Sequence, residues 1–103
     1  MMQVEITRFA RLQLKQIYAW YKIKASEKIA LKIIDKILDS IEELGNLPGI
    51  GSIEPHLAHI PRQYKYIGCG NCKIIFRIAN NIVFVTDIFD CRQNPRKIIK
   101  RST

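Results

Sequence analysis

The sequence predicts an α+β fold of the order β-α-α-β-β-β that ends in a short basic C-terminal tail or helix. Two observations predict this fold. Two long amphipathic helical patterns follow a short strand near the N-terminus, and three strand patterns separated by tight-turn signals come after them. A chain of 103 residues has room for one modest core. We therefore expect residues 1–103 to form one domain, in which the N-terminal strand is followed by a two-helix antiparallel hairpin that packs on a three-stranded antiparallel meander.

The first helix is expected directly after the first strand. Gln3–Ile6 alternates polar and apolar residues as a short strand does, and Thr7 is a suitable N-cap for a helix from Arg8 to about Lys24. The apolar residues of this helix recur at helical spacing and form one stripe: Ala10, Leu14, Ile17, Tyr18 and Tyr21. We expect this stripe to lie against the sheet.

The second helix begins soon after the first one ends. Ser26 can cap a helix from Glu27 to Leu44, which again has one apolar stripe. Gly45 is expected to follow the helix as its C′ residue, and Pro48 to prevent the helix from resuming. Because only two or three residues join the two helices, they must fold back on each other as an antiparallel hairpin.

The three strands of the meander are expected after a long irregular loop over residues 45–61. They comprise Tyr64–Ile67, Cys72–Ala79 and Ile82–Asp90, with Gly70-Asn71 and Asn80-Asn81 as turn signals. The last strand is apolar on both faces as far as Val85, which is typical of a central strand that is covered on both sides.

The positive charge of the chain is concentrated in its second half. Residues 1–60 hold eight Lys or Arg and seven Asp or Glu, whereas residues 61–103 hold nine against two, so that the second segment carries +7 of the formal net charge of +8. Cations gathered on a sheet and a tail favour an acidic or polyanionic partner. The alternative interpretation is a basic surface that only keeps the protein in solution.

The composition argues against a membrane protein and against a metalloprotein. No apolar run approaches the roughly 20 residues of a membrane span, and the N-terminus does not resemble a secretory signal. Three cysteines, an odd number, are typical of a reducing compartment, so we expect a cytoplasmic protein without a membrane partner. Cys69 and Cys72 form a Cys-x-x-Cys pair, but a structural zinc ion needs four ligands, and no metal or other cofactor is predicted.

Three short motifs together resemble those of a known family. Gly70–Ile78, which reads Gly-Asn-Cys-Lys-Ile-Ile-Phe-Arg-Ile, is similar to a Gly-Asn-Tyr-Arg-φ-φ-Tyr-Arg-φ strand, in which φ is apolar. Ile88–Ile98 is similar to a closing Phe-Asp-x-Arg-Gln-Asn-Pro-x-Lys-φ segment, and Leu44–Gly51 to a Leu-x-x-x-Pro-x-x-Gly break. In this order and spacing the motifs resemble the RelE/ParE toxin superfamily over nearly the whole chain. Cys72 and Phe76 depart from its pattern, because both stand where tyrosine is usual.

The resemblance implies a toxin of a type II toxin–antitoxin pair that is neutralised by a cognate antitoxin protein. Two mechanisms occur in the superfamily: the ParE branch inhibits DNA gyrase, and the RelE branch cuts messenger RNA on the ribosome. The long helical hairpin favours the ParE branch. Gyrase inhibition is therefore our first expectation, and a ribosome-dependent mRNA endoribonuclease is the alternative. The third hypothesis is a non-toxic degenerate member of the superfamily, or a generic nucleic-acid binder that uses the basic sheet.

Catalytic residues are needed only if the protein is a nuclease. Cleavage of RNA through its own 2′-OH requires a base, an acid and cations that face the developing phosphorane. The cations expected on one surface of the sheet are Lys65, Lys73, Arg77 and Arg92, and the only histidines, His56 and His59, are the candidate proton-transfer groups. Under either mechanism the basic tail is expected to be exposed and to bind a partner through Arg96, Lys97, Lys100 and Arg101.

Overall fold

The computed structural model describes residues 1–47 and 49–102, so that the expected role of Pro48 lies outside the described residues. The helices and strands, in chain order, are β1 (Gln3–Ile6), α1 (Arg8–Lys24), α2 (Glu27–Asn46), β2 (Ser52–Ile53), β3 (Lys65–Cys69), β4 (Cys72–Ala79), β5 (Ile82–Asp90) and α3 (Arg96–Ser102). A 3₁₀ turn, η1, covers Pro55–Leu57. No helix within the described ranges is long and apolar enough to cross a membrane.

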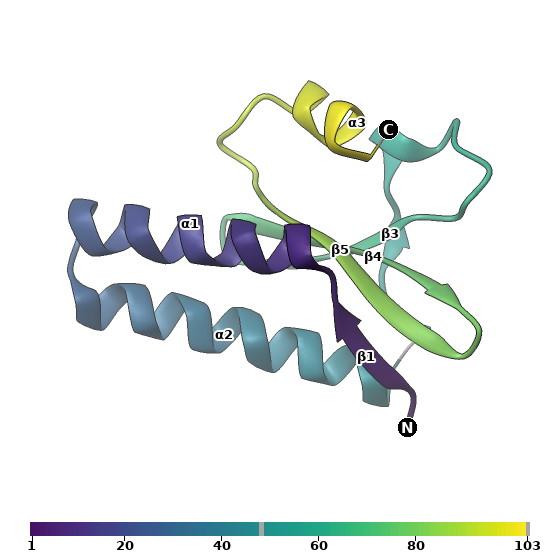
Figure 1. The fold of residues 1–103 in the computed structure, drawn as a ribbon, viewed down its shortest axis with the longest axis horizontal. Helices are drawn as coiled ribbons and strands as arrows, with labels where there is room; N and C mark the ends of the chain where they lie inside the picture. The colour runs from purple at the N-terminus through teal and green to yellow at the C-terminus, as the bar shows by residue number, and fades with distance from the viewer. Residues whose placement is uncertain (48, 103) are drawn as a thin grey trace.

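Side-chain caps explain where the two long helices begin. The amide of Ala10 donates a hydrogen bond to Thr7 Oγ1 at 3.2 Å, and the amide of Ile29 donates one to Ser26 Oγ at 3.1 Å. Each cap satisfies one of the amides that has no partner inside its helix. The expected bounds of α1 are confirmed, and α1 and α2 lie side by side as the expected hairpin (Figure 1).

Helix α2 continues to Asn46, so the expectation that Gly45 stands just outside the helix is wrong. Gly45 is buried because the start of β1 crosses the helix here, and the Met2 amide donates a hydrogen bond to the Gly45 carbonyl at 2.9 Å. A Cβ atom on residue 45 would lie only 2.8 Å from the Met2 carbonyl oxygen. The glycine is therefore required for close backbone approach and not for ending the helix.

The sheet has five strands in the order β1-β5-β4-β3-β2, and the predicted meander is its central part. Strand β1 pairs in parallel with β5, and the two-residue β2 pairs antiparallel with β3. Strand β5 thus lies between two neighbours, as its apolar pattern predicted. The turn between β4 and β5 has Asn80 and Asn81 at φ values of 52° and 65°, the left-handed conformations that a two-residue hairpin turn requires.

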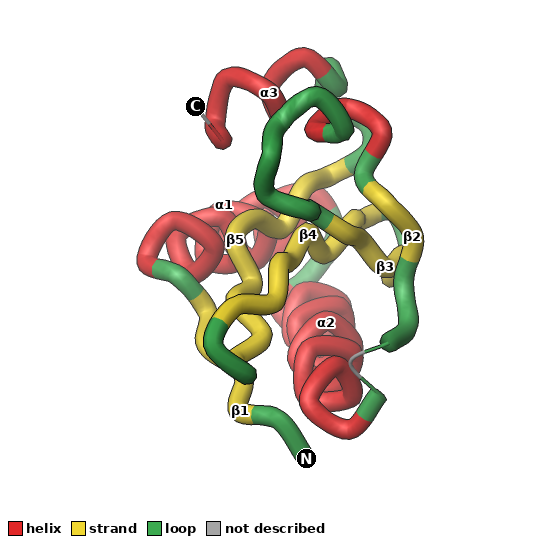
Figure 2. The backbone as a smooth tube through the Cα atoms, turned by 90° about the vertical axis from the view of Figure 1, so that its right-hand side faces the viewer, coloured by secondary structure: helices red, strands yellow, loops and turns green. Residues whose placement is uncertain are grey.

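Helices cover the sheet on both faces (Figures 1 and 2). Helices α1 and α2 cover one face, where their apolar stripes pack on Ile74, Phe76, Val83 and Val85. On the opposite face η1 and α3 cover a second, smaller core. Figure 2 shows α3 on the far side of the strands from α2. The buried members of this second core are Leu57, Tyr64, Ile75, Phe89 and Ile98. The C-terminal segment is therefore a packed helix.

Candidate functional site

Arg92 follows the last strand and lies against helix α1. Its Nε donates to Asp90 Oδ1 at 3.0 Å, and its Nη2 also contacts Asp90 and donates to the Tyr21 hydroxyl at 3.0 Å. The guanidinium carbon lies 4.4 Å from the centre of the Trp20 ring and 5.3 Å from that of Tyr21. Hydrogen bonds from Arg92 hold the pKa of Asp90 below its ordinary value, because they stabilise the carboxylate. We call Asp90 and Arg92 the Arg92 pair.

A cavity of about 350 Å³ opens beside the Arg92 pair, between α1 and the end of β5. It combines aromatic rings, amide side chains and one ion pair. Its lining residues are Gln13, Gln16, Ile17, Trp20, Tyr21, Ile88, Asp90, Arg92 and Gln93. A concave, partly apolar site with a few polar groups is the kind that binds a partner's side chains.

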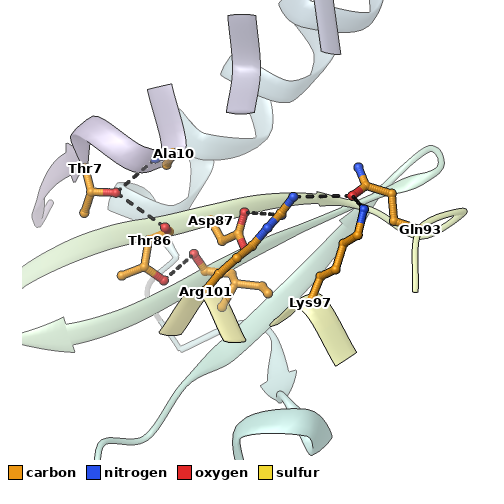
Figure 3. A network of polar contacts seen from close by, with 8 residues as sticks. Thr7, Ala10, Thr86, Asp87, Gln93, Lys97 and Arg101 are labelled. Carbon is orange, nitrogen blue, oxygen red and sulfur yellow. Dashed lines mark hydrogen bonds and ion pairs between the residues drawn. The ribbon is translucent and has the colours of Figure 1, made fainter. Parts of the chain in front are cut away.

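Arg101 of α3 pairs with Asp87 on the opposite face of the sheet (Figure 3). Its Nη1 lies 3.2 and 3.3 Å from the two Asp87 carboxylate oxygens, and its Nη2 donates to Gln93 Oε1 at 3.3 Å. The rings of Phe9 and Phe89 lie about 5.5 Å from its guanidinium carbon. Burial raises the pKa of Asp87, and the Arg101 charge opposes that shift. We call Asp87 and Arg101 the Arg101 pair.

The expectation that all four tail cations are exposed is therefore wrong for Arg101. Its side chain is only 17 % exposed, because Ile98, one turn earlier, packs into the second core and carries Arg101 onto Asp87. Arg96, Lys97 and Lys100 are exposed, and Lys97 also donates to Gln93 at 3.3 Å.

Glu54, His56 and Lys73 form a cluster, the His56 cluster, on the face that carries α3. The side chain of Glu54 is fully buried, and its Oε1 lies 2.8 Å from His56 Nδ1. Lys73 Nζ lies 3.0 and 3.2 Å from the two carboxylate oxygens and 4.3 Å from the centre of the Tyr66 ring. A buried carboxylate that bonds one ring nitrogen fixes the orientation of the histidine. His59 is exposed and lies outside this cluster.

The expectation that Lys65, Lys73, Arg77 and Arg92 face one surface is wrong. Lys73 belongs to the His56 cluster, whereas Arg92 lies on the α1 side of the sheet. Lys65 and Arg77 lie in a third place, where they line a shallow hollow together with Arg62 near the Ala79 end of β4. The guanidinium carbon of Arg77 lies 5.1 Å from the centre of the Phe84 ring. Lys73 and Arg77 share one face of β4 but lie four residues apart along the strand, and Arg92 lies on the opposite face, so the four cations are spread over three places.

Sequence reasoning missed the acidic partners of these cations. Asp87 and Asp90 are the only acids after residue 60, among nine basic residues, and each one binds an arginine. Glu54 is likewise the only acid in the long loop, and it is buried. The sequence did hold a signal for these ion pairs, namely a lone carboxylate beside an apolar strand in a basic segment. Such a carboxylate is buried only when it is paired, so a cationic partner could have been expected.

Helix α1 also presents apolar side chains to solvent. Phe9, Leu12, Trp20 and Ile23 are spaced so that they share one flank of the helix, with Ile23 80 % exposed. Exposed cations lie along the neighbouring flank: Arg8, Arg11, Lys15 and Lys22. Near the N-terminal end, Phe9 and Leu12 form a hollow with three of these cations. We call this exposed surface the α1 stripe; it is separate from the buried apolar stripe of the same helix, which packs on the sheet.

No group of three or more His, Cys, Asp or Glu side chains in the described part of the chain could hold a metal ion. The sites described above offer three kinds of contact: an arginine held against aromatic rings, a histidine oriented by a carboxylate, and an exposed stripe that suits an apolar partner.

The order of elements and the helical hairpin on the sheet are those that the resemblance to the RelE/ParE superfamily led us to expect. The family model for the ParE toxin of the type II toxin–antitoxin system parDE matches residues 4–95. The chain therefore belongs to the ParE toxin family, and it is a toxin of the type II toxin–antitoxin class.

A solved structure has the same fold. A chain described as "Chromosomal ParDE TA system from P. aeruginosa" superposes with a TM-score of 0.74 at 22% sequence identity, over 87% of this chain and 96% of that one. No protein with a curated description matches the sequence.

Proposed function

We propose that this toxin inhibits DNA gyrase and that a cognate antitoxin neutralises it. Membership of the ParE family supports the target, and one observation carries the proposal: the cations that a nuclease would gather are separated in three places. Lys73 and Arg92 are each bound by a carboxylate, which lowers their effect on an RNA phosphate. A protein-binding inhibitor needs no such convergence, only exposed surfaces that fit its target.

The proposal is tested by two assays on the same purified toxin. Gyrase supercoiling is measured beside cleavage of messenger RNA on programmed ribosomes. We expect loss of supercoiling and intact mRNA, and growth arrest in cells with an induced DNA-damage response. Site-specific cleavage of ribosome-bound mRNA that is abolished in Arg77→Ala would contradict gyrase inhibition as the mechanism.

The exposed cations of α3 are our candidates for the contact with the target. Arg96 and Lys97 project from a helix that the second core holds in place. Reversal of both to Glu should weaken inhibition severalfold and leave folding intact, because exposed charges contribute little stability. The matched control reverses Lys28 and Lys32, two exposed cations of α2. Equal loss in both variants would show that only net charge matters.

The α1 stripe is our candidate for the antitoxin. Its apolar side chains bordered by cations fit an amphipathic helix with acidic residues beside its apolar face. We expect Leu12→Glu to abolish binding of the small protein encoded beside the toxin. The control Leu38→Glu changes a residue of similar exposure on α2, 40 % against 49 %, and should bind normally.

The complex should also unfold at a higher temperature than the free toxin. A ligand that binds only the native state adds about 4 kcal/mol at a thousandfold excess over Kd. If the neighbouring protein left the unfolding temperature unchanged, it would not be the antitoxin of this toxin.

One observation favours the alternative, a ribosome-dependent endoribonuclease. Glu54 orients His56 as a general base would be oriented. Under this alternative His56→Ala should reduce mRNA cleavage on the order of 10²-fold or more, whereas His59→Ala, a change at an exposed residue outside the cluster, should have no effect. Under gyrase inhibition both changes should leave activity unaltered.

A further inference from the structure

Cys69 and Cys72 face each other directly across the turn between β3 and β4. Cys69 is the last residue of β3, Cys72 is the first residue of β4, and the sheet register pairs them. Gly70 has a φ of +59°, as the first central residue of a two-residue hairpin turn requires. Directly paired residues have Cα atoms about 4.5–5.5 Å apart, within the roughly 4.4–6.8 Å that a disulfide spans. The sheet register therefore places the two cysteines within the reach of a disulfide bond.

The two thiols differ in access to solvent. Cys69 is partly exposed at the tip of the hairpin, whereas Cys72 is buried in the main core at 3 % exposure. Burial, reinforced by the nearby Asp90 carboxylate, raises the pKa of Cys72 to about 11. A small oxidant therefore reaches Cys69 first, and Cys72 is placed to react with the product.

We propose that Cys69 and Cys72 are a redox-sensitive dithiol, which hydrogen peroxide converts into a disulfide across the hairpin and which small thiols reduce again. The Cys69 thiolate attacks one peroxide oxygen, the O–O bond breaks, and hydroxide leaves and is protonated to water. This gives Cys69 sulfenic acid. The Cys72 sulfur then attacks the Cys69 sulfur, the S–O bond breaks, and the departing oxygen takes up the Cys72 proton and leaves as water. The two sulfurs lose two electrons in all, and the peroxide gains them.

The bridge would form beside the Arg92 pair. Asp90 is the direct partner of Cys72 in the register of β4 and β5, and the Arg92 charge also acts on the Cys72 thiol. Oxidation therefore changes the packing beneath the carboxylate that holds Arg92 against α1. Because a disulfide across a turn closes a very short loop, its main effect is this local change and not added stability.

The third cysteine, Cys91, is an alternative disulfide partner for Cys69 or Cys72. Cys91 is exposed, and its amide donates to the Asn71 carbonyl at 2.8 Å, so it lies near the same turn. It directly follows Asp90, the last residue of β5, and the sheet register pairs it with neither Cys69 nor Cys72. The register favours the pair Cys69–Cys72 over any bridge to Cys91.

The test uses the full chain, hydrogen peroxide and mass spectrometry. After oxidation and blocking with a maleimide, trypsin releases residues 66–73 with both hairpin cysteines and residues 78–92 with Cys91 alone. We expect the first peptide to lose two hydrogen atoms and take up no maleimide, and the second to take up one. Dithiothreitol before blocking should restore two maleimides on the first peptide.

Variants separate the proposal from other thiol chemistry. Cys69→Ser, a change at a partly exposed residue, should abolish the mass loss, and Cys91→Ser should retain it. Cys72→Ala should leave Cys69 as a trapped sulfenic acid or a mixed disulfide. A crosslink between the two peptides, a disulfide-linked dimer through Cys91, or two maleimide-reactive thiols in residues 66–73 after peroxide would each overturn the proposal.

Discussion

Strand β5 carries two aspartate–arginine pairs that lie on opposite faces of the sheet. The Arg92 pair is at the surface of the α1 side, with 45 % of the Arg92 side chain and 12 % of the Asp90 side chain exposed. The Arg101 pair lies under α3, with the corresponding values at 17 % and 3 %. Arg92 donates to its carboxylate through two nitrogens, Nε and Nη2, whereas Arg101 contacts both oxygens of Asp87 through Nη1 alone. Each arginine lies against two aromatic rings.

The pKa shifts of the two aspartates have opposite signs. Hydrogen bonds from Arg92 dominate at Asp90 and lower its pKa, whereas desolvation dominates at Asp87 and raises its pKa. Arg92 therefore more than offsets the partial burial of the Asp90 carboxylate near the surface. Arg101 offsets only part of the cost of burying the Asp87 carboxylate under α3. The comparison indicates different roles: the Arg101 pair holds α3 on the sheet, and the Arg92 pair presents a guanidinium to the cavity beside α1.

Removal of the buried carboxylate should give the largest effect. Asp87→Ala leaves the Arg101 charge under α3 without its counter-charge, and we expect a loss of about 3–5 kcal/mol in the free energy of unfolding. Asp90→Ala should cost only about 1–2 kcal/mol, because Arg92 can turn to water. Urea unfolding of both variants measures the difference. Equal losses would show that the two pairs do not differ in burial as described.

The apolar anchor of α3 should have the next largest effect. Ile98 is 1 % exposed, and Ile98→Ala should cost about 2–4 kcal/mol. Hydrogen exchange should then become faster in residues 96–102 but not in α1, because α3 alone loses its contact with the second core. Unchanged exchange in α3 would mean that the Arg101 pair holds the helix without Ile98.

The effect of salt on the coupling energy within each pair should also differ, but by less than the changes in stability described above. A double-mutant cycle on the Arg92 pair should give a coupling of about 1 kcal/mol or less in dilute buffer that falls further at 1 M salt, since exposed charges are screened. The coupling of the Arg101 pair should change little with salt. A strong salt dependence of the Arg101 pair would place it at the surface.

Asp90 and Asp87 should contribute to the pH dependence of stability with opposite signs. This is the smallest of the expected effects. Asp90 has its pKa lowered in the folded state, so its contribution is present above the unfolded value near 4 and is lost as pH falls through the folded pKa. Asp87 has its pKa raised, so its contribution decreases as pH rises from about 4 through the folded pKa. Asp90→Asn should therefore flatten the rise of stability with pH, and Asp87→Asn should steepen it. Thermal unfolding between roughly pH 2 and 6 measures both slopes, and slopes that change in the same direction would contradict the assignment.

Features set by neighbouring residues could be predicted from the sequence, and features set by distant ones could not. The start of α1 follows from its local cap at Thr7, and the hairpin turn at Asn80-Asn81 follows from a local backbone preference. The role of Gly45 depends on Met2, which is far away in the chain, and a two-residue strand such as β2 has no pattern of its own. The cations of the sheet could be named, but their grouping depended on Glu54, Asp87 and Asp90, whose partners only the tertiary structure brings close.

The parallel pairing of β1 with β5 also sets when this protein can fold during its own synthesis. Gln3 pairs with Ile82, so the first strand must wait for a partner that is made about eighty residues later. At roughly 5–20 residues per second the ribosome needs roughly 4–16 s for that interval. The helical hairpin can form early from contacts within itself, but its apolar stripes lack the sheet until β4 and β5 have emerged. The nascent chain therefore exposes apolar surface for seconds, and the Arg92 and Arg101 pairs come into existence only at the end of that period.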